Sequence, residues 1–213
     1  MKKIICLLLV LISLFACTSC ALVDKIFGKK GSVETVRGIV DDSQPTKIVT
    51  RTEYVGKDTL TGLYTTKIDR ASGVSQFDFE YQRYAEVEDL LPESIKTVHG
   101  SVVYHADGSV TDANGDTWSA EDALGYIFES INLDPAGFKS YELLDNGNDL
   151  KAYVPAGESV RIFGTSVEAK GDILLEIDTN GKYLYNVKIT YTATDDATVV
   201  VNTSYDYAHV SVG

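Results

Sequence analysis

The most reactive side chains of this sequence are three cysteines, and all of them lie within the first 20 of its 213 residues. They are Cys6, Cys17 and Cys20. The rest of the chain therefore has no thiol pair for a disulfide and no thiolate set for a structural metal site. A chain of this length needs neither, because it can bury enough apolar surface in one core. Any cysteine chemistry belongs to the N-terminal segment.

This N-terminal segment has the layout of a signal peptide. Lys2 and Lys3 precede an uncharged apolar run over residues 4–16, which is too short to span a bilayer comfortably as a permanent helix. The run ends in Leu14-Phe15-Ala16-Cys17, which resembles the lipobox of bacterial lipoproteins. In that family the cysteine sulfur receives a diacylglycerol, and the chain is cut just before it. The resemblance implies a signal peptide over residues 1–16, lipidation at Cys17 and a lipidated tether over residues 17–31.

Two alternatives to lipidation at Cys17 remain open. Cys20 is the other possible acceptor, but Cys17 would then occupy the position where the lipobox has an aliphatic residue, so Cys17 is favoured. The second alternative is an ordinary secretory signal with incidental cysteines. The lipobox resemblance predicts an exported protein, held by its lipid on the outer face of the cell membrane, or on an envelope membrane if the cell has two.

The charge of the chain argues against nucleic acid as a partner. The sequence has 31 acidic and 19 basic residues, for a formal net charge of −12. Loss of Lys2 and Lys3 with the signal peptide lowers this to −14. Nucleic-acid binding needs a concentrated positive face, which this composition does not provide.

Two acidic segments contain oxygen ligands of the kind that calcium prefers. Asp112, Asn114 and Asp116 alternate like the start of a calcium loop, but the sixth position is Thr117 rather than glycine and the twelfth is Ala123 rather than glutamate. A turn that leads into a capped helix explains these residues better. Residues 145–149 form the second acidic segment, whose composition is that of a solvent-facing loop.

No constellation typical of an enzyme is found. His99, His105 and His209 lack metal-ligand spacing and have no nucleophile in a recognisable motif. Asp78 and Glu80 lie two residues apart, and on an alternating strand they form the solvent face opposite Phe77 and Phe79. We therefore expect a non-catalytic protein without a cofactor or a metal.

Hydrophobic periodicity predicts a sheet-dominated domain over residues 32–213. Ser32 caps a short helix that runs to about residue 41, and Ser119 precedes an amphipathic helix over residues 120–132. A further helical turn or short helix is predicted after Asp134-Pro135, carrying Phe138, Tyr141 and Leu144. Strands are predicted over residues 46–55, 60–69, 75–84, 96–104, 151–154, 160–167, 172–178, 183–193 and 198–207, with a short strand after Asp107-Gly108.

These elements define an α+β, mostly antiparallel fold. One large sheet curls, and a short N-terminal helix and an inserted amphipathic helix cover its concave face. The order of elements over residues 32–207 resembles the LolA-like superfamily of half-open barrels, which includes periplasmic lipoprotein carriers and the mycobacterial lipid-binding lipoproteins. The likeness is carried by the early helix that runs into long strands and by the closing hairpin over residues 173–207.

The LolA-like resemblance implies a cavity between sheet and helices for a hydrophobic or amphiphilic ligand, such as a lipid. Tyrosines combine an apolar body with a polar tip that suits such a ligand, although they also fill ordinary cores. Gly62, Gly100 and Gly164 are small residues that would leave room inside it. The candidate cavity residues are Tyr64, Phe79, Leu124, Ile127, Phe128, Tyr185, Ile189 and Tyr191. The alternative is an envelope interaction or adhesion module with a filled interior that works through its outer surface.

Overall fold

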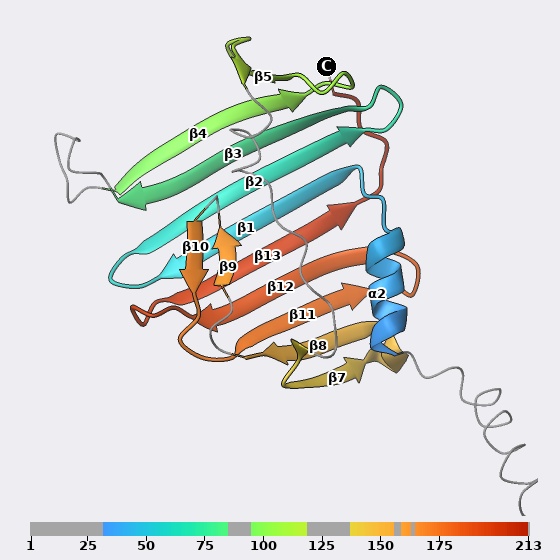
Figure 1. Cartoon of the computed structure of the whole chain (residues 1–213), viewed down its shortest axis with the longest axis vertical. Coiled ribbons are helices and arrows are strands. Elements are labelled where there is room, and N and C mark those ends of the chain that lie inside the picture. Colours follow the sequence, from blue (N-terminus) through green and yellow to red (C-terminus); the bar gives the residue numbers. More distant parts are fainter. Residues whose placement is uncertain (1–31, 85–94, 119–136, 156–158, 163–164, 213) are drawn as a thin grey trace, which may run out of the picture.

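The computed structural model describes residues 32–84, 95–118, 137–155, 159–162 and 165–212. The predicted signal peptide, the tether with Cys17 and Cys20, and the predicted helix over residues 120–132 lie outside these described residues. The described residues form one 11-stranded antiparallel sheet, a separate two-stranded hairpin and one α-helix (Figure 1).

Helix α2 (Val33–Asp42) opens the described chain, as predicted. The Ser32 hydroxyl accepts a hydrogen bond from the Thr35 backbone N–H, and the Thr35 hydroxyl accepts one from the Ser32 N–H, which completes a capping box. Val33 and Val36 are buried on the face of the helix that packs against the sheet. Ser43 ends the helix by donating to the carbonyl of Ile39 at 2.6 Å.

Most strands lie close to their predicted ranges. In the first half they are β1 (Lys47–Val55), β2 (Thr59–Asp69), β3 (Val74–Tyr84), β4 (Ile95–Tyr104), β5 (Val110–Asp112) and β6 (Thr117–Trp118). In the second half they are β7 (Ser140–Leu144), β8 (Asp149–Val154), β9 (Ser159–Ile162), β10 (Thr165–Glu168), β11 (Ile173–Thr179), β12 (Leu184–Thr192) and β13 (Thr198–Asp206). A 3₁₀ turn, η2 (Asp145–Gly147), joins β7 to β8.

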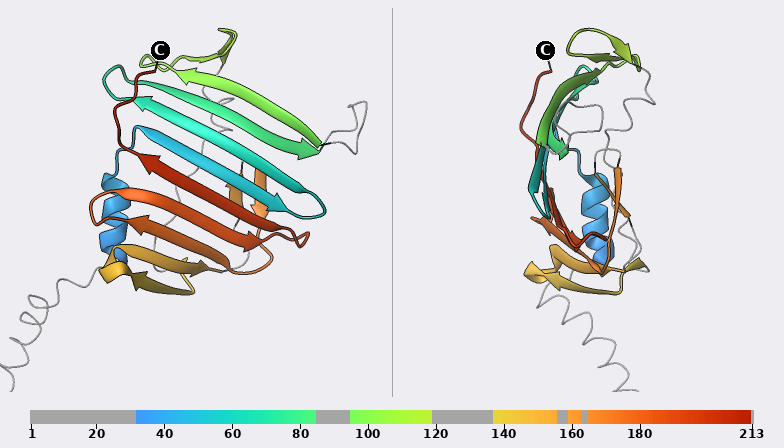
Figure 2. Two further views of the ribbon diagram at one scale, coloured as in Figure 1. Left: turned by 180° about the vertical axis from the view of Figure 1, so that it is seen from behind. Right: turned by 90° about the vertical axis from the view of Figure 1, so that its left-hand side faces the viewer.

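The first and last strands pair at the centre of the sheet. The strand order is β6-β5-β4-β3-β2-β1-β13-β12-β11-β8-β7, so β1 and β13 join two meanders into one open sheet. The sheet curves toward the side on which α2 and the β9–β10 hairpin lie (Figure 2, right). The concave surface is called the inner face below, and the opposite surface the outer face.

The main core lies on the inner face of the second half. Strands β8, β11, β12 and β13 contribute most of its buried side chains, and α2 adds Val33 and Val36. Leu175, Ile177, Val199 and Val201 are each at most 1% exposed. Burial of each such side chain contributes roughly 1.5–3 kcal/mol, so this half supplies most of the hydrophobic stabilisation of the described sheet.

Two segments differ from their predicted secondary structure. Residues 140–144, predicted as helical, form strand β7, and Lys139 N–H already donates to the Tyr153 carbonyl of β8 at 2.8 Å. Pairing with β8 therefore overrides the local helical spacing. Residues 160–167, predicted as one strand, divide between β9 and β10, whose ends pair as Thr165 with Ile162.

Candidate functional site

The candidate cavity residues separate into three groups. Tyr64, Ile189 and Tyr191 lie on the inner face and are 2%, 6% and 3% exposed, and Phe79 lies on the same face and is half-buried. Leu124, Ile127 and Phe128 lie outside the described residues. The sheet therefore places four of the eight candidates on one concave surface.

The placement of Tyr185 on the inner face was wrong. The register between β11 and β12 shifts at Asp178 and Thr179, so the alternation is interrupted at the start of β12. Tyr185 is 48% exposed as a result, while its neighbour Leu184 is 3% exposed. The Tyr185 hydroxyl accepts a hydrogen bond from the Asn180 side-chain amide at 3.0 Å.

Aromatic rings form a continuous group on the inner face of β2 and β3. The Tyr64 ring lies 6.4 Å from Phe77 and 6.3 Å from Tyr81, and Phe79 lies 5.8 Å from Phe77 and 6.2 Å from Tyr81. Offset aromatic pairs at such separations contribute about 0.5–1.5 kcal/mol each beyond their buried area. Each ring of this group thus contacts at least one other ring of the group.

The glycines expected to open a cavity are covered by these rings. A Cβ at Gly62 would stand 2.3 Å from the Tyr64 hydroxyl oxygen, and a Cβ at Gly100 would stand 2.4 Å from Phe79 Cζ. Each glycine therefore gives an aromatic side chain room to lie flat on the sheet. Gly164, the third glycine, lies outside the described residues.

Buried hydroxyls lie at the centre of the inner face, where β1, β2 and β13 meet. Thr50 Oγ1 and Thr203 Oγ1 are 3.0 Å apart, and both residues are buried. Burial raises the pKa of Tyr64 far above its usual range, and its hydrogen bond with Thr52 lowers that pKa only in part. These side chains are neutral at physiological pH, so their polar contacts with a ligand would be hydrogen bonds rather than ion pairs.

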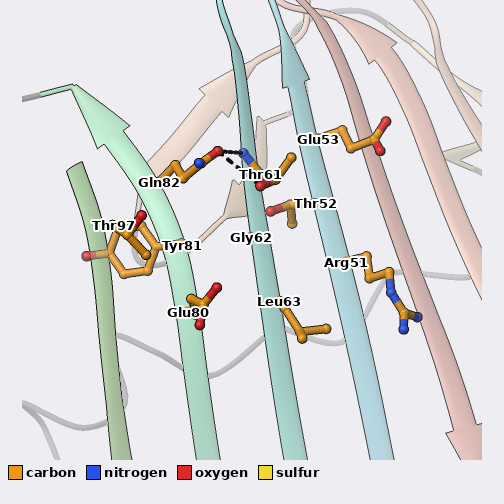
Figure 3. Close-up of a pocket in the computed structure, with 10 residues that line it drawn as sticks. All are labelled: Arg51, Thr52, Glu53, Thr61, Gly62, Leu63, Glu80, Tyr81, Gln82 and Thr97. Atoms are coloured by element: carbon orange, nitrogen blue, oxygen red, sulfur yellow. Dashed lines mark hydrogen bonds between the residues drawn. The ribbon is translucent and has the colours of Figure 1, made fainter. Parts of the chain in front are cut away.

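The outer face of β1–β4 carries an open depression of about 250 Å³ (Figure 3). Arg51, Glu53, Leu63, Glu80 and Gln82 contribute to its lining. Gln82 Oε1 accepts hydrogen bonds from the Thr61 backbone N–H at 3.1 Å and from the Thr61 hydroxyl at 3.0 Å, which fixes one wall. Leu63 is 44% exposed, so the depression combines charged rims with an apolar contact.

A row of mostly charged and polar side chains crosses this outer face from β4 to β7. Its members are direct partners on nine successive strands, and we call them the charge row: His99, Glu80, Leu63, Arg51, Asn202, Lys188, Glu176, Lys151 and Glu142. Opposite charges face each other along its second half, where Lys188 Nζ lies 3.7 Å from Glu176 Oε2. Cross-strand pairs of this kind stabilise a sheet by roughly 0.2–1 kcal/mol each.

The centre of the charge row, where β1 meets β13, contains polar groups that the described residues do not satisfy. Arg51 forms no ion pair with any described residue. Its partner Asn202 has a buried Oδ1 atom without a hydrogen-bond partner in the described structure. Burying such an oxygen unpaired costs about 1–3 kcal/mol. The sequence shows these residues at alternating strand positions, but only the strand register brings them together.

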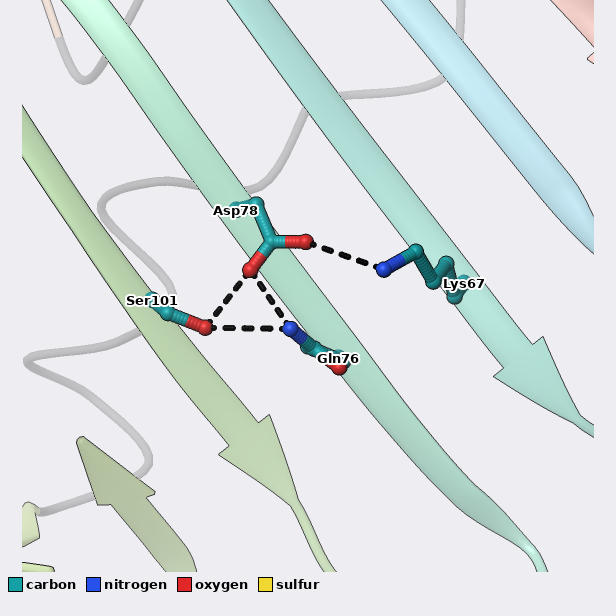
Figure 4. Close-up of polar contacts among 4 residues, drawn as sticks. All are labelled: Lys67, Gln76, Asp78 and Ser101. Atoms are coloured by element: carbon teal, nitrogen blue, oxygen red, sulfur yellow. Dashed lines mark hydrogen bonds and ion pairs between the residues drawn. The ribbon is translucent and has the colours of Figure 1, made fainter. Parts of the chain in front are cut away.

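Asp78 organises a second polar cluster on the outer face (Figure 4). Its Oδ1 accepts hydrogen bonds from Gln76 Nε2 and Ser101 Oγ, each at 2.6 Å, and its Oδ2 lies 3.5 Å from Lys67 Nζ. Partial burial raises the pKa of Asp78, but the hydrogen bonds and Lys67 lower it more, so the net pKa lies below the usual value. Asp78 is thus on the outer face, as predicted, and its contacts are structural.

The acidic segments form local turns. Asp112 Oδ1 accepts from the backbone N–H groups of Asn114 and Asp116 at 2.8 and 2.9 Å. Asp149 Oδ1 accepts from the Thr179 N–H at 2.9 Å, and Gly147 is buried, so residues 145–149 pack against β11 rather than forming a purely solvent-facing loop. No group of three or more metal-ligating side chains occurs among the described residues.

Comparisons with known proteins add little to this geometry. No protein-family model and no curated protein matches the chain. Among solved structures, the chain is similar to a porin-like protein from Bacteroides uniformis, with 12% sequence identity and a TM-score of 0.23. The match covers 72% of this chain and 58% of that one. A TM-score this low does not indicate the function of the chain. No helix within the described ranges is long and apolar enough to cross a membrane.

Proposed function

We propose that this protein is a membrane-anchored, extracytoplasmic lipoprotein without catalytic activity, which binds a partner through the outer face of its sheet. The observation that carries this proposal is the depression on the outer face, where Leu63, which is 44% exposed, lies directly beside its strand partner Arg51, an exposed cation that forms no ion pair with any described residue. A partner that supplies a carboxylate to Arg51 would desolvate and pair that cation. The aromatic rings over Gly62 and Gly100 further favour a filled interior over a cavity.

The outer-face proposal is tested by site-specific photo-crosslinking in the native host. A photoreactive residue at Leu63, which is 44% exposed, should give one discrete adduct, and Arg51→Glu should abolish that adduct. Lys151→Glu is the matched charge reversal from the far half of the charge row and should leave the adduct intact. An adduct that survives Arg51→Glu contradicts a role for the charge row in binding.

The lipid anchor rests on the lipobox-like sequence, and it has its own test. Cys17→Ala should abolish acylation and release the protein from the membrane fraction, whereas Cys20→Ala should leave both unchanged. Acylation that persists in Cys17→Ala and disappears in Cys20→Ala would move the lipid site to Cys20.

A second candidate function is binding of a hydrophobic or amphiphilic ligand, such as a lipid, on the inner face. Phe79, Tyr81 and Tyr104 support it, because they lie on this face and are only half-buried. Native mass spectrometry of residues 32–213, which contain every described element, tests this function. A co-purifying acyl-chain species would favour it, and an apo mass that stays unchanged when lipid is offered would exclude it.

A further inference from the structure

The turn between β11 and β12 presents tyrosine rings and a lysine to solvent. Tyr183 and Tyr185 are 36% and 48% exposed, and Lys182 Nζ lies 4.8 Å from the centroid of the Tyr183 ring. The Tyr183 ring packs on the Tyr207 ring at a centroid distance of 4.7 Å, and this contact restricts the orientation of Tyr183. Gly181, with φ +80°, makes the tight turn that holds this group at the tip of the hairpin.

The same end of the sheet receives the chain from the N-terminal segment. Helix α2 starts after Ser32 and contacts η2. Asn148, the residue directly after η2, is tied to the hairpin because its carbonyl accepts a hydrogen bond from the Thr179 hydroxyl at 2.6 Å. The far end of α2 is tied to the same hairpin, since the Leu184 N–H donates to the Ser43 hydroxyl at 3.2 Å. Figure 1 shows α2 lying across this end of the strands.

Contact with a lipid surface would explain both the exposed tyrosines and lysine of the hairpin and the start of α2 at the same end of the sheet. Tyrosine and lysine side chains are suited to the membrane interface, because each joins an apolar body to a polar tip. The 15 residue steps from Cys17 to Ser32 can span at most about 50 Å, so an anchored domain stays close to the bilayer. Asp145, Asp178 and Asp206 lie at this end of the strands together with Lys47 and Lys182. The end therefore has no excess of basic charge that would select an anionic surface, and a zwitterionic surface fits it.

We infer that the hairpin tip formed by Lys182, Tyr183 and Tyr185 rests in the headgroup region of a zwitterionic bilayer. This inference depends on the proposed lipid anchor. The contact orients the domain rather than holding it, since the acyl chains supply the attachment. The strands then rise steeply from the membrane, the opposite turn at Gly56–Asp58 points away from it, and the charge row runs parallel to the surface.

Depth-dependent quenching of tryptophan fluorescence tests this orientation in the full-length acylated protein. Tyr183→Trp and Tyr153→Trp are each made in a Trp118→Phe background. Tyr153 is the control because it is 37% exposed and lies near the C-terminal end of β8, away from the hairpin tip. In vesicles of phosphatidylcholine that contain brominated phosphatidylcholine, emission from position 183 should fall at least twofold relative to unbrominated vesicles. Emission from position 153 should not change.

Because Tyr183 packs on Tyr207, Tyr185→Trp provides a second probe at a side chain with greater exposure, and it should be quenched as well. Co-flotation with vesicles is measured on the same samples. Protein that floats but shows no quenching at 183 or 185 overturns the inference and leaves the anchor intact. If the protein carries no acyl group and does not float, the proposed lipid anchor is wrong, and the orientation that depends on it is wrong as well.

Discussion

The ring of Phe79 lies directly over Gly100, its partner on the neighbouring strand, so that a Cβ at position 100 would stand 2.4 Å from Cζ. Gly100→Ala must therefore displace the ring from β4. We expect a loss of about 1–3 kcal/mol in the free energy of unfolding, as is typical of overpacking. Urea denaturation followed by circular dichroism measures this loss.

The matched control for this change is Gly38→Ala. Gly38 lies in α2, and a methyl group added there would meet no neighbouring atom within 4 Å among the described residues, so the same substitution should stabilise the protein by roughly 0.5–1 kcal/mol. Phe79→Leu should reduce the cost of Gly100→Ala, because it removes the atoms that clash. Equal effects at Gly38 and Gly100 would contradict the packing seen on the inner face.

The buried pair Thr50 and Thr203 should behave as one unit. Thr50→Val leaves the Thr203 hydroxyl without this partner in a buried site, and we expect it to cost about 1–3 kcal/mol. The double variant Thr50→Val with Thr203→Val should be closer to the wild type than either single variant. Additive losses in the double-mutant cycle would show that the two hydroxyls do not interact.

Asp78 should stabilise the protein above its unfolded-state pKa. Its pKa is lowered in the folded state, so its contribution is present at neutral pH and is lost as the pH falls through the folded-state value. We expect Asp78→Asn to cost about 1 kcal/mol at pH 7 and nothing measurable at acid pH, where the wild-type carboxyl is protonated. Lys67→Ala should cost less, because this ion pair is about one-third exposed.

Tyr205 should make the fold sensitive to alkali. Burial, with a smaller effect of Tyr207, raises the pKa of Tyr205 to about 12, whereas tyrosine in an unfolded chain titrates near 10. The contribution of neutral Tyr205 to the free energy of unfolding is therefore fully present below about pH 10 and is lost as the pH rises toward 12. Tyr205→Phe should flatten the fall in stability between about pH 10 and 12, measured by urea denaturation. An unchanged slope would contradict this assignment.

Long alternating segments were the part of the fold that could be predicted from sequence. The boundaries of β1, β2, β3 and β4 agree with the predictions to within one residue, because each strand has one apolar and one polar face. The capped helix α2 was predicted for a similar reason, since Ser32 precedes a regular apolar stripe. The Asn180-Gly181 and Asp107-Gly108 turns likewise have positive-φ glycines.

Features that depend on strand register could not be predicted in this way. The shift beside Thr179 exposes Tyr185, although the local alternation predicts burial. Residues 140–144 have apolar spacing compatible with a helix, and only pairing with β8 selects a strand. Asn202 and Arg51 come together because β1 pairs with β13, a contact between residues about 150 positions apart.

The central pairing of β1 with β13 also sets the order in which the molecule can mature. The two meanders consist mostly of neighbours in sequence and can form early, but they join only when the final strand is present. Strand β13, residues 198–206, is the last strand of the described sheet to be translated. Until it has paired, its two neighbours β1 and β12 are both exposed edge strands. A chain truncated before Thr198 should therefore aggregate as two unjoined half-sheets, because only β13 pairs with both β1 and β12.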